Sequence, residues 1–335
     1  MKRIVSLSLL CIMIIIAQTG CGQKEKKEIS DSGFYLDTQC TITVYSEDEE
    51  KGKEIVADAF ELCKNYEDKM SKTIKGSDVY KVNNAGGKAV SVSDETKEVI
   101  EMGIEMCEAS DGKFDITVGR LTDLWDFKSD DPEVPSENDL EQAVSTVGSE
   151  KIKIRGNDVV IEGGKAKIDL GGIAKGYISG KVADFIEEQG VENAVINFGG
   201  NVVTIGKKTD GSDWNVGIQD PNAEGQQILG VTKAADQAVI TSGIYERKFK
   251  AGGKTYHHII DPKTGYPVEN DVEGVTLKCP RDKAGQCDAM STICLLMGSD
   301  EGMKFIESNK DFEALFYCKD GSVKKTEGMD FEKRE

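Results

Sequence analysis

The sequence predicts an α+β fold for this chain of 335 residues. Apolar residues alternate with polar ones in several short runs, as in strands, and recur every three or four positions in others, as in helices. The two kinds of run are mixed without the regular alternation of a doubly wound sheet. Thirty-six glycines against six prolines indicate many tight turns, and neither an internal repeat nor a long linker divides the chain. We therefore expect one large domain.

The first 20 residues have the pattern of a secretion signal. Lys2 and Arg3 precede an apolar run at 4–17, which is shorter than a membrane-spanning helix needs. Small residues then lead to Cys21, and this pattern resembles a bacterial lipoprotein signal that is cleaved before a lipidated cysteine. An ordinary secretion signal with an incidental cysteine is the alternative.

This pattern divides the chain into a signal peptide at 1–20, a polar tether at 21–32 and a domain at 33–335. We expect the protein to lie outside the cytoplasm, attached to the bacterial cell membrane through lipid on Cys21. Removal of the signal leaves 40 basic against 60 acidic residues, a formal net charge of −20. Such a surface repels nucleic acid and anionic lipid, so neither is an expected partner.

Seven of the nine cysteines remain once Cys11 is removed with the signal and Cys21 is lipidated. They show no C-x-x-C spacing, which argues against a zinc site or a redox pair. Cys63, Cys107 and Cys294 fall on apolar helix faces and are expected to be buried.

The first half of the domain alternates strands, turns and helices. A β-branched run predicts a strand at 41–45, and helical spacing predicts helices at 53–70 and from the cap Ser93 to about residue 109. Residues 71–88 are rich in turn formers, and an apolar segment at 112–125 is followed by a polar loop. Further on we expect a short helix at 140–147 and a hairpin of strands at 151–154 and 159–161.

The second half is mainly strands with two helices. The expected helices span 284–297 and 300–308, and the expected strands span 202–205, 214–218, 227–231, 238–241, 275–277 and 314–318.

Between these halves, residues 167–201 carry two glycine pairs at the ends of expected strands. A strand at 166–170 leads to Gly171-Gly172 and then to a helix that stops at Gly190, and a strand at 194–196 leads to Gly199-Gly200. Glycines between strand and helix allow a ligand to approach the backbone, and the N–H groups of a helix N-terminus attract phosphate. A tight turn chosen only for packing is the alternative.

The chain has two histidines, His257 and His258, at the end of an expected strand. Adjacent strand residues point to opposite faces, so one of the two at most enters a given site. A histidine there is a candidate general base, although such a pair is more often structural.

Asp288 and Thr292 lie one turn apart on the helix expected at 284–297 and share a face. The apolar stripe of this helix is formed by Met290, Ile293 and Met297, and Asp288 is expected on the opposite side from Met290, away from the core. A carboxylate with a hydroxyl suits Mg²⁺, which also binds waters and substrate phosphates. A solvated helix face is the alternative.

Asp115 and Asp169 stand beside turns and are candidates for ligand contacts or turn caps. Thr241-Ser242 could bind phosphate or form a turn. The sequence has no G-x-S-x-G, Walker A or G-x-G-x-x-G motif, so hydrolase, P-loop and Rossmann interpretations lack support.

Six blocks of sequence, taken in order, resemble the ApbE family of FAD:protein FMN transferases, and the resemblance runs from about Phe34 to Phe316. The blocks are GKFDITVGRLTDLW (112–125), KIDLGGIAKGY (167–177), INFGGN (196–201), TSGIYER (241–247), YHHIIDPKTGYP (256–267) and DAMSTICLLMG (288–298).

This resemblance implies a single two-lobed catalytic domain with mixed or antiparallel sheets and flanking helices. It implies Mg²⁺-dependent transfer of the FMN part of FAD to a threonine or serine hydroxyl of an acceptor flavoprotein, with release of AMP. The implied metal ligands are the side chains of Asp288 and Thr292 and the carbonyl of Gly172, and the implied catalytic residues are His258 and Asp288. The residues implied to contact FAD are Leu36, Lys113, Phe114, Asp115, Asp169, Lys175 and Ile260.

The chain departs from the family where its early Met-Gly-Thr is replaced by Leu36-Asp37-Thr38, which adds a side chain where glycine is usual. Two other functions are alternatives. The same residues fit a Mg²⁺-dependent FAD pyrophosphatase, in which water replaces the acceptor hydroxyl. A lipoprotein that binds a solute without catalysis is the other alternative, and the helix with oxygen ligands and the strand-end histidine argue against it.

Overall fold

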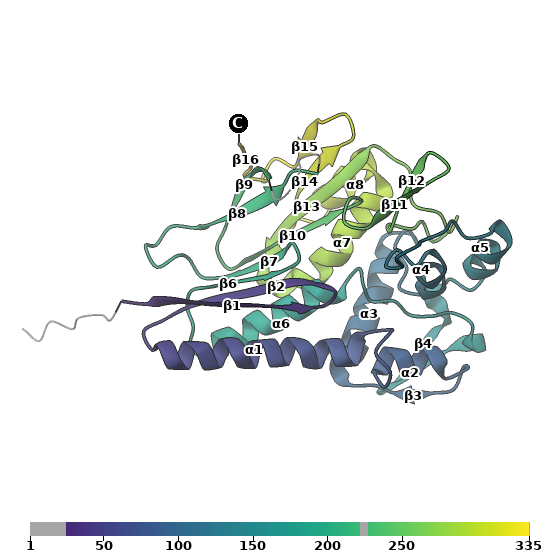
Figure 1. Ribbon diagram of the computed structural model, residues 1–335, viewed down its shortest axis with the longest axis horizontal. Coiled ribbons are helices and arrows are strands. Elements are labelled where there is room, and N and C mark those ends of the chain that lie inside the picture. Colours follow the sequence, from purple (N-terminus) through teal and green to yellow (C-terminus); the bar gives the residue numbers. More distant parts are fainter. Residues whose placement is uncertain (1–24, 222–226, 335) are drawn as a thin grey trace, which may run out of the picture.

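An eight-stranded sheet, antiparallel throughout, forms the centre of the computed structural model, which describes residues 25–221 and 227–334 (Figure 1). Its strands follow the order β1 (Lys27–Tyr35), β2 (Thr38–Ser46), β6 (Ala194–Phe198), β7 (Asn201–Ile205), β10 (Gln237–Gly243), β13 (Val272–Pro280), β14 (Glu313–Cys318) and β15 (Val323–Lys325).

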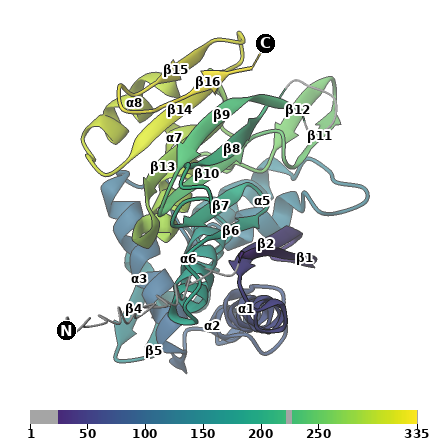
Figure 2. The same cartoon turned by 90° about the vertical axis from the view of Figure 1, so that its left-hand side faces the viewer.

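Helices cover one face of this sheet, and the main hydrophobic core lies between the two layers (Figures 1 and 2). Helices α6 (Ala174–Glu188) and α7 (Ala284–Met297) pack against each other, α6 against β7 and α7 against β10 and β13. Helix α1 (Glu49–Met70) packs on α6 and β1, and α8 (Ser299–Glu307) packs on α7 and β14.

Smaller units flank the central layers. One lobe combines the sheet β3-β5-β4 with four helices, and a second small sheet has the order β16-β9-β8. The elements of the lobe are α2 (Asp78–Asn84), β3 (Val90–Ser91), α3 (Asp94–Ala109), α4 (Gly119–Trp125), α5 (Glu137–Val144), β4 (Ile152–Arg155) and β5 (Asp158–Ile161). The other strands are β8 (Trp214–Gln219), β9 (Ile228–Ala234), β16 (Glu332–Lys333) and the hairpin β11 (Lys248–Ala251) with β12 (Lys254–His257). Single 3₁₀ turns occupy Ser149–Lys151, Glu162–Gly164 and Arg281–Lys283.

The α+β class is confirmed, and most expected helices and strands are present with small shifts at their ends. Ser93 caps α3 through its side chain, as expected. The seven cysteines of the described residues are free and buried, which confirms the expectation for Cys63, Cys107 and Cys294. Among the residues that the structure describes, no helix combines the length and the apolar character needed to cross a membrane.

Two expectations about local structure are wrong. The strand expected at 166–170 is absent, and the segment makes only an isolated bridge from Lys167 to Val118. The N–H and the carbonyl of Ile168 bond to the side chain of Asn83 and not to a neighbouring strand, and the Asp169 side chain then closes a turn by accepting from the N–H of Gly171. The turn-rich stretch at 71–88 contains α2. The segment at 112–125, for which no element was expected, contains α4.

The tether expected at 21–32 is also shorter than predicted. Residues 27–32 belong to β1 and pair with β2, where Ile29 is buried against the core. The signal peptide at 1–20 and Cys21 lie outside the described residues.

Helix α6 crosses α7 closely at Gly176, which gives a testable effect on stability. A Cβ at Gly176 would lie 2.3 Å from the carbonyl oxygen of Ala284 and 2.6 Å from the Cβ of Asp288. We expect Gly176→Ala to lower the free energy of unfolding by about 1–3 kcal/mol, because the helices must separate. Chemical denaturation measures the change.

Gly180 provides the matched control, one turn further along α6. A Cβ there meets its nearest neighbour, the Cβ of Ala284, at an ordinary 3.4 Å. Gly180→Ala should therefore raise the free energy of unfolding by about 0.5–1 kcal/mol, as expected for a helix interior. Equal effects of the two substitutions would contradict the close crossing at Gly176.

Candidate active site

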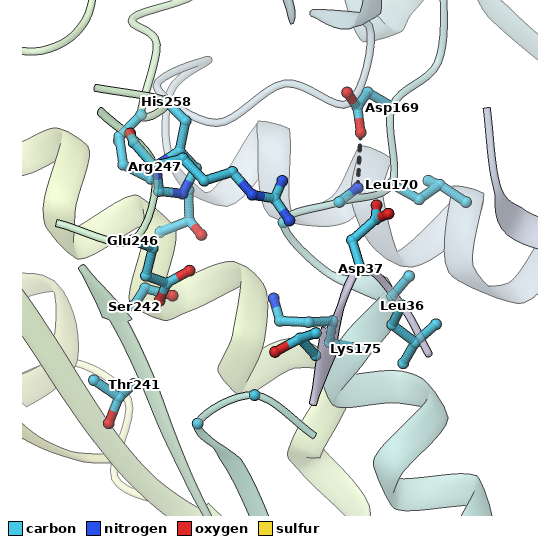
Figure 3. A pocket seen from close by; sticks show the side chains of 18 of the residues that line it. Leu36, Asp37, Asp169, Leu170, Lys175, Thr241, Ser242, Glu246, Arg247 and His258 are labelled. Atoms are coloured by element: carbon cyan, nitrogen blue, oxygen red, sulfur yellow. Dashed lines mark hydrogen bonds between the residues drawn. The ribbon is translucent and has the colours of Figure 1, made fainter. Parts of the chain in front are cut away.

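A cleft of about 1240 Å³ opens between the central layers and the smaller lobe, and the predicted contact residues lie along it. In Figure 3, His258, Arg247 and Glu246 stand on one wall, Asp169 and Leu36 stand on the other, and Lys175 lies between them. The cleft is larger than the common range of about 300–1,000 Å³ for ligand pockets. The predicted residues that line it are Leu36, Lys113, Phe114, Asp115, Asp169, Gly172, Lys175, His258, Ile260 and Thr292.

Asp288 is the exception, because it is buried beneath the wall with 1% of its surface exposed. The expectation that it faces away from the core is wrong. Helix α7 packs on β10 and β13 and also on α6 and α3, so nearly all of its faces are covered. Helical periodicity alone could not show this, because a helix enclosed on both sides has no solvated face.

One oxygen of the Asp288 carboxylate accepts a hydrogen bond, and the other has none. Oδ2 accepts the N–H of Gly176 at 2.8 Å, so Asp288 caps the first turn of α6. Oδ1 is buried and has no hydrogen-bond partner, and the Lys175 Nζ lies 3.8 Å away. A buried carboxylate oxygen without a hydrogen bond is costly, and a metal cation bound there would compensate it more fully than Lys175 does at 3.8 Å.

The other two predicted metal ligands lie close to each other. Thr292 is one turn after Asp288 on α7, and a Cβ at Gly172 would lie 3.6 Å from the Thr292 Oγ1. Among the described residues, no group of three or more histidines, cysteines and carboxylates forms a metal cluster. One carboxylate with hydroxyl and carbonyl oxygens fits Mg²⁺, which keeps waters and substrate phosphates as its remaining ligands.

Three N–H groups at the N-terminal end of α6 already have acceptors within the protein. Those of Ile173 and Ala174 bond to the carbonyl of Leu170, and that of Gly176 bonds to Asp288. Phosphate recognition at this helix end therefore cannot depend on these three groups.

Asp169 is held in place by several groups that the sequence did not single out. Its Oδ1 accepts from the N–H of Gly171 at 2.9 Å, a hydrogen bond drawn as the dashed line in Figure 3. Its Oδ2 accepts from the Thr122 hydroxyl at 2.6 Å and lies 3.1 Å from the Lys72 Nζ. Burial alone would raise the pKa of Asp169, but Lys72 and these hydrogen bonds together lower it. Asp169 is therefore ionised at neutral pH.

Asp115 has protein partners on both carboxylate oxygens. Oδ1 accepts from the N–H and hydroxyl of Thr117 at 2.7 and 2.6 Å, and Oδ2 accepts from the N–H of Ser149 at 3.0 Å. This carboxylate orders the loop behind the cleft. Neighbouring Lys113 reaches Glu301 of α8 at 3.3 Å.

The two histidines separate as predicted. His258 lines the cleft, whereas His257 is buried, lines a separate cavity of about 630 Å³ and places Nε2 3.0 Å from the Val268 carbonyl. The His258 Nδ1 lies 3.3 Å from the Arg247 carbonyl, so an Nδ1–H there leaves Nε2 as the acceptor. Burial, with Arg247 nearby, lowers the pKa of His258 to about 3, so the ring is neutral.

Sequence reasoning assigned no role to Glu246 and Arg247, which also line the cleft and lie in the TSGIYER block. Burial raises the pKa of Glu246 and Asp288 adds to this, while Lys175 and Arg247 oppose it.

Ser242 bonds to Ser291 of α7 at 2.7 Å, which ties β10 to the helix that carries Asp288.

The Leu36-Asp37 step forms the two-residue turn between β1 and β2. Both residues have positive φ, 53° and 60°, as a type I′ turn requires. The Leu36 N–H bonds to Glu67 at 3.0 Å, and Asp37 forms an ion pair with Lys128. Asp37 thus adopts a conformation that suits glycine. Leu36 lines the cleft although Leu36-Asp37-Thr38 replaces the Met-Gly-Thr of the family.

A substitution series isolates the cost of this left-handed aspartate. In a Lys128→Ala background, where the exposed ion pair is absent, we expect Asp37→Gly to raise the free energy of unfolding by about 1 kcal/mol. Chemical denaturation of the single and double variants measures the effect. A loss of stability in that background would contradict the turn conformation.

Comparison with known proteins identifies relatives along nearly the whole domain. The model of the ApbE family matches residues 36–316. The FAD:protein FMN transferase of Klebsiella pneumoniae (strain 342) is 30% identical over 302 residues, which cover 89% of this chain and 92% of that protein. The FAD:protein FMN transferase of Treponema pallidum (strain Nichols) is 29% identical, covering 96% of this chain and 92% of that protein.

Solved structures agree with the fold. The ApbE protein of Thermotoga maritima superposes with a TM-score of 0.81 at 33% identity, covering 90% of this chain and 97% of that chain. The flavin transferase ApbE of Vibrio cholerae gives a TM-score of 0.78 at 28% identity with the same coverage. The resemblance drawn from the six sequence blocks is confirmed.

Proposed function

Because the chain belongs to the ApbE family, we propose that it transfers the FMN part of FAD to a threonine or serine hydroxyl of an acceptor flavoprotein and releases AMP. One observation carries the proposal. Ten residues from distant parts of the sequence line a single cleft, and the free oxygen of Asp288 lies beneath its wall. That arrangement suits a dinucleotide whose diphosphate needs local compensation in an acidic protein.

Asp288, Thr292 and the Gly172 carbonyl would hold Mg²⁺, which supplies charge neutralisation of the diphosphate. Lys175 and Arg247 add positive charge along the cleft. Asp169, fixed by its hydrogen bonds, would accept a hydrogen bond from a polar group of FAD. These residues bind and orient the substrate before any bond changes.

In the transfer, the acceptor hydroxyl oxygen forms a bond to the FMN phosphorus as the bond from that phosphorus to the AMP oxygen breaks. His258 is neutral, lines the cleft and has Nε2 as its acceptor, so it can take the hydroxyl proton. AMP leaves with the electron pair of the broken bond. If water enters in place of the hydroxyl, the same step gives free FMN, which is the pyrophosphatase alternative.

The test is to incubate the protein with FAD, MgCl₂ and a candidate acceptor that carries a threonine. We expect covalent flavin fluorescence on the acceptor in a denaturing gel, lost on chelation and on replacing the acceptor threonine by valine. Free FMN with no labelled acceptor would favour the pyrophosphatase, and no conversion of FAD would overturn both.

We also propose lipid attachment at Cys21 and a location outside the cytoplasm. The support is the apolar run at 4–17 followed by small residues and Cys21. Mass spectrometry of the membrane fraction should find a chain that begins at a diacylated Cys21. A soluble chain that retains residues 1–20 would contradict the proposal.

A further inference from the structure

Lys72 lies just after α1 and lines the cleft, but no motif assigns it a role. Its Nζ is 2.6 Å from the Thr122 hydroxyl oxygen, 2.7 Å from Oδ1 of Asp123 and 3.1 Å from Oδ2 of Asp169. An ammonium group has three N–H donors, so the protein itself uses all three. Lys72 therefore has no donor left for a ligand, although it stands at the edge of the cleft.

These partners of Lys72, together with a longer contact of 3.5 Å to the Gly119 carbonyl, come from two other segments of the chain. Thr122 and Asp123 belong to α4, whereas Asp169 precedes the glycine pair that leads into α6. The Thr122 hydroxyl accepts from Lys72 and donates to the same Oδ2 of Asp169 that Lys72 contacts. Lys72 and Thr122 therefore act on one oxygen of Asp169 together.

The other oxygen of Asp169 connects this cluster to the backbone of the cleft. Oδ1 accepts from the N–H of Gly171, so the orientation of the carboxylate sets the turn at the glycine pair. With Lys72 absent, Asp169 would keep two hydrogen bonds but lose the cation beside it. The side chain of Asp169 is only 18% exposed, so water could replace that cation only in part.

We propose that Lys72 is a positioning residue. It fixes the orientation and charge of Asp169, which contacts FAD, and does not itself touch the substrate. This inference rests on the proposed function, in which Asp169 contacts FAD. It predicts that loss of Lys72 weakens FAD binding while the chemical step continues once FAD is bound. A purely structural Lys72 would instead reduce the folded fraction and leave the affinity of the folded molecules unchanged.

Lys167 offers a matched control, because it is a second lysine that forms an ion pair with Asp123. Its Nζ lies 2.7 Å from Oδ2 of Asp123. Its side chain is 40% exposed, and Lys167 is not among the residues that line the cleft. Removal of Lys167 thus tests loss of one ion pair with Asp123 while the contacts of Asp169 remain.

The experiment compares Lys72→Met, Lys72→Arg and Lys167→Met in the full-length protein. Flavin fluorescence titration gives the dissociation constant for FAD, steady-state transfer gives KM and kcat, and thermal melting reports stability. We expect Lys72→Met to raise the dissociation constant and KM for FAD by about 10- to 100-fold, the effect measured for groups that orient metal-ligating side chains. The kcat should change less than about threefold. Lys72→Arg should recover part of the affinity, and Lys167→Met should leave both constants unchanged.

Equal FAD affinities for Lys72→Met and Lys167→Met would overturn the positioning role while leaving the proposed function intact. A Lys72→Met protein that binds FAD normally but melts lower would show a structural role and would also overturn it. Failure of the unaltered protein to bind FAD would instead overturn the proposed function.

Discussion

Asp288→Asn is expected to lower the transfer rate by about 10³-fold or more, because it removes the only carboxylate among the three predicted metal ligands. The amide oxygen can still accept from the Gly176 N–H, so the cap on α6 and the fold should persist. Isothermal titration with MgCl₂ should show the loss of metal affinity directly, and flavin transfer to an acceptor gives the rate.

Stability should change in the opposite sense. In the absence of metal, the buried Asp288 Oδ1 has no hydrogen bond, and its only compensation is the Lys175 ammonium group 3.8 Å away, which is costly for the folded state. Asp288→Asn should therefore melt at the same temperature as the unaltered protein or at a higher one when no metal is present. A folded variant with unchanged metal affinity and transfer would contradict the assignment of Asp288.

His258→Asn is expected to reduce the transfer rate by about 10²- to 10⁴-fold, the usual contribution of a positioned base. The dissociation constant for FAD should change little, because the imidazole is expected to act on the acceptor hydroxyl. The pKa of His258, lowered to about 3 mainly by burial, keeps the ring neutral across the physiological range. Lowering the pH should therefore cause no loss of activity through protonation of His258 until well below pH 5.

The adjacent His257 is the control for this prediction. His257 lies on the other side of its strand, with Nε2 3.0 Å from the Val268 carbonyl and outside the cleft. His257→Asn should lower the melting temperature and leave the rate per folded molecule unchanged. If both substitutions reduced the rate equally, the distinction between the two histidines would be lost.

The local sequence predicted those helices that have a clear periodicity or a recognisable cap. The expected bounds of α7 match the structure, and α3 begins directly after its Ser93 cap. The strand expected at 166–170 is absent because the Asn83 side chain bonds both backbone groups of Ile168 and Asp169 closes a turn at Gly171. Of the hairpin formed by β11 and β12, only the strand that ends at the histidines was expected, and β11 was missed because its four residues carry little signal.

The site was predicted by a different kind of information. All of its predicted residues except Leu36 lie in the six blocks, and no spacing rule brings Gly172 next to Thr292, which is 120 positions later. The blocks could not reveal Lys72, whose partner Asp169 is 97 positions away and whose surroundings read only as turns. Burial of Asp288 was also hidden, because it depends on the elements packed around α7.

A crystal structure with FAD and Mn²⁺ in place of Mg²⁺ tests the central claim most directly. The account predicts an anomalous difference peak within ligand distance of Oδ1 of Asp288, Oγ1 of Thr292 and the carbonyl oxygen of Gly172, next to the diphosphate of FAD. A metal peak away from Asp288, or FAD bound outside this cleft, would contradict it.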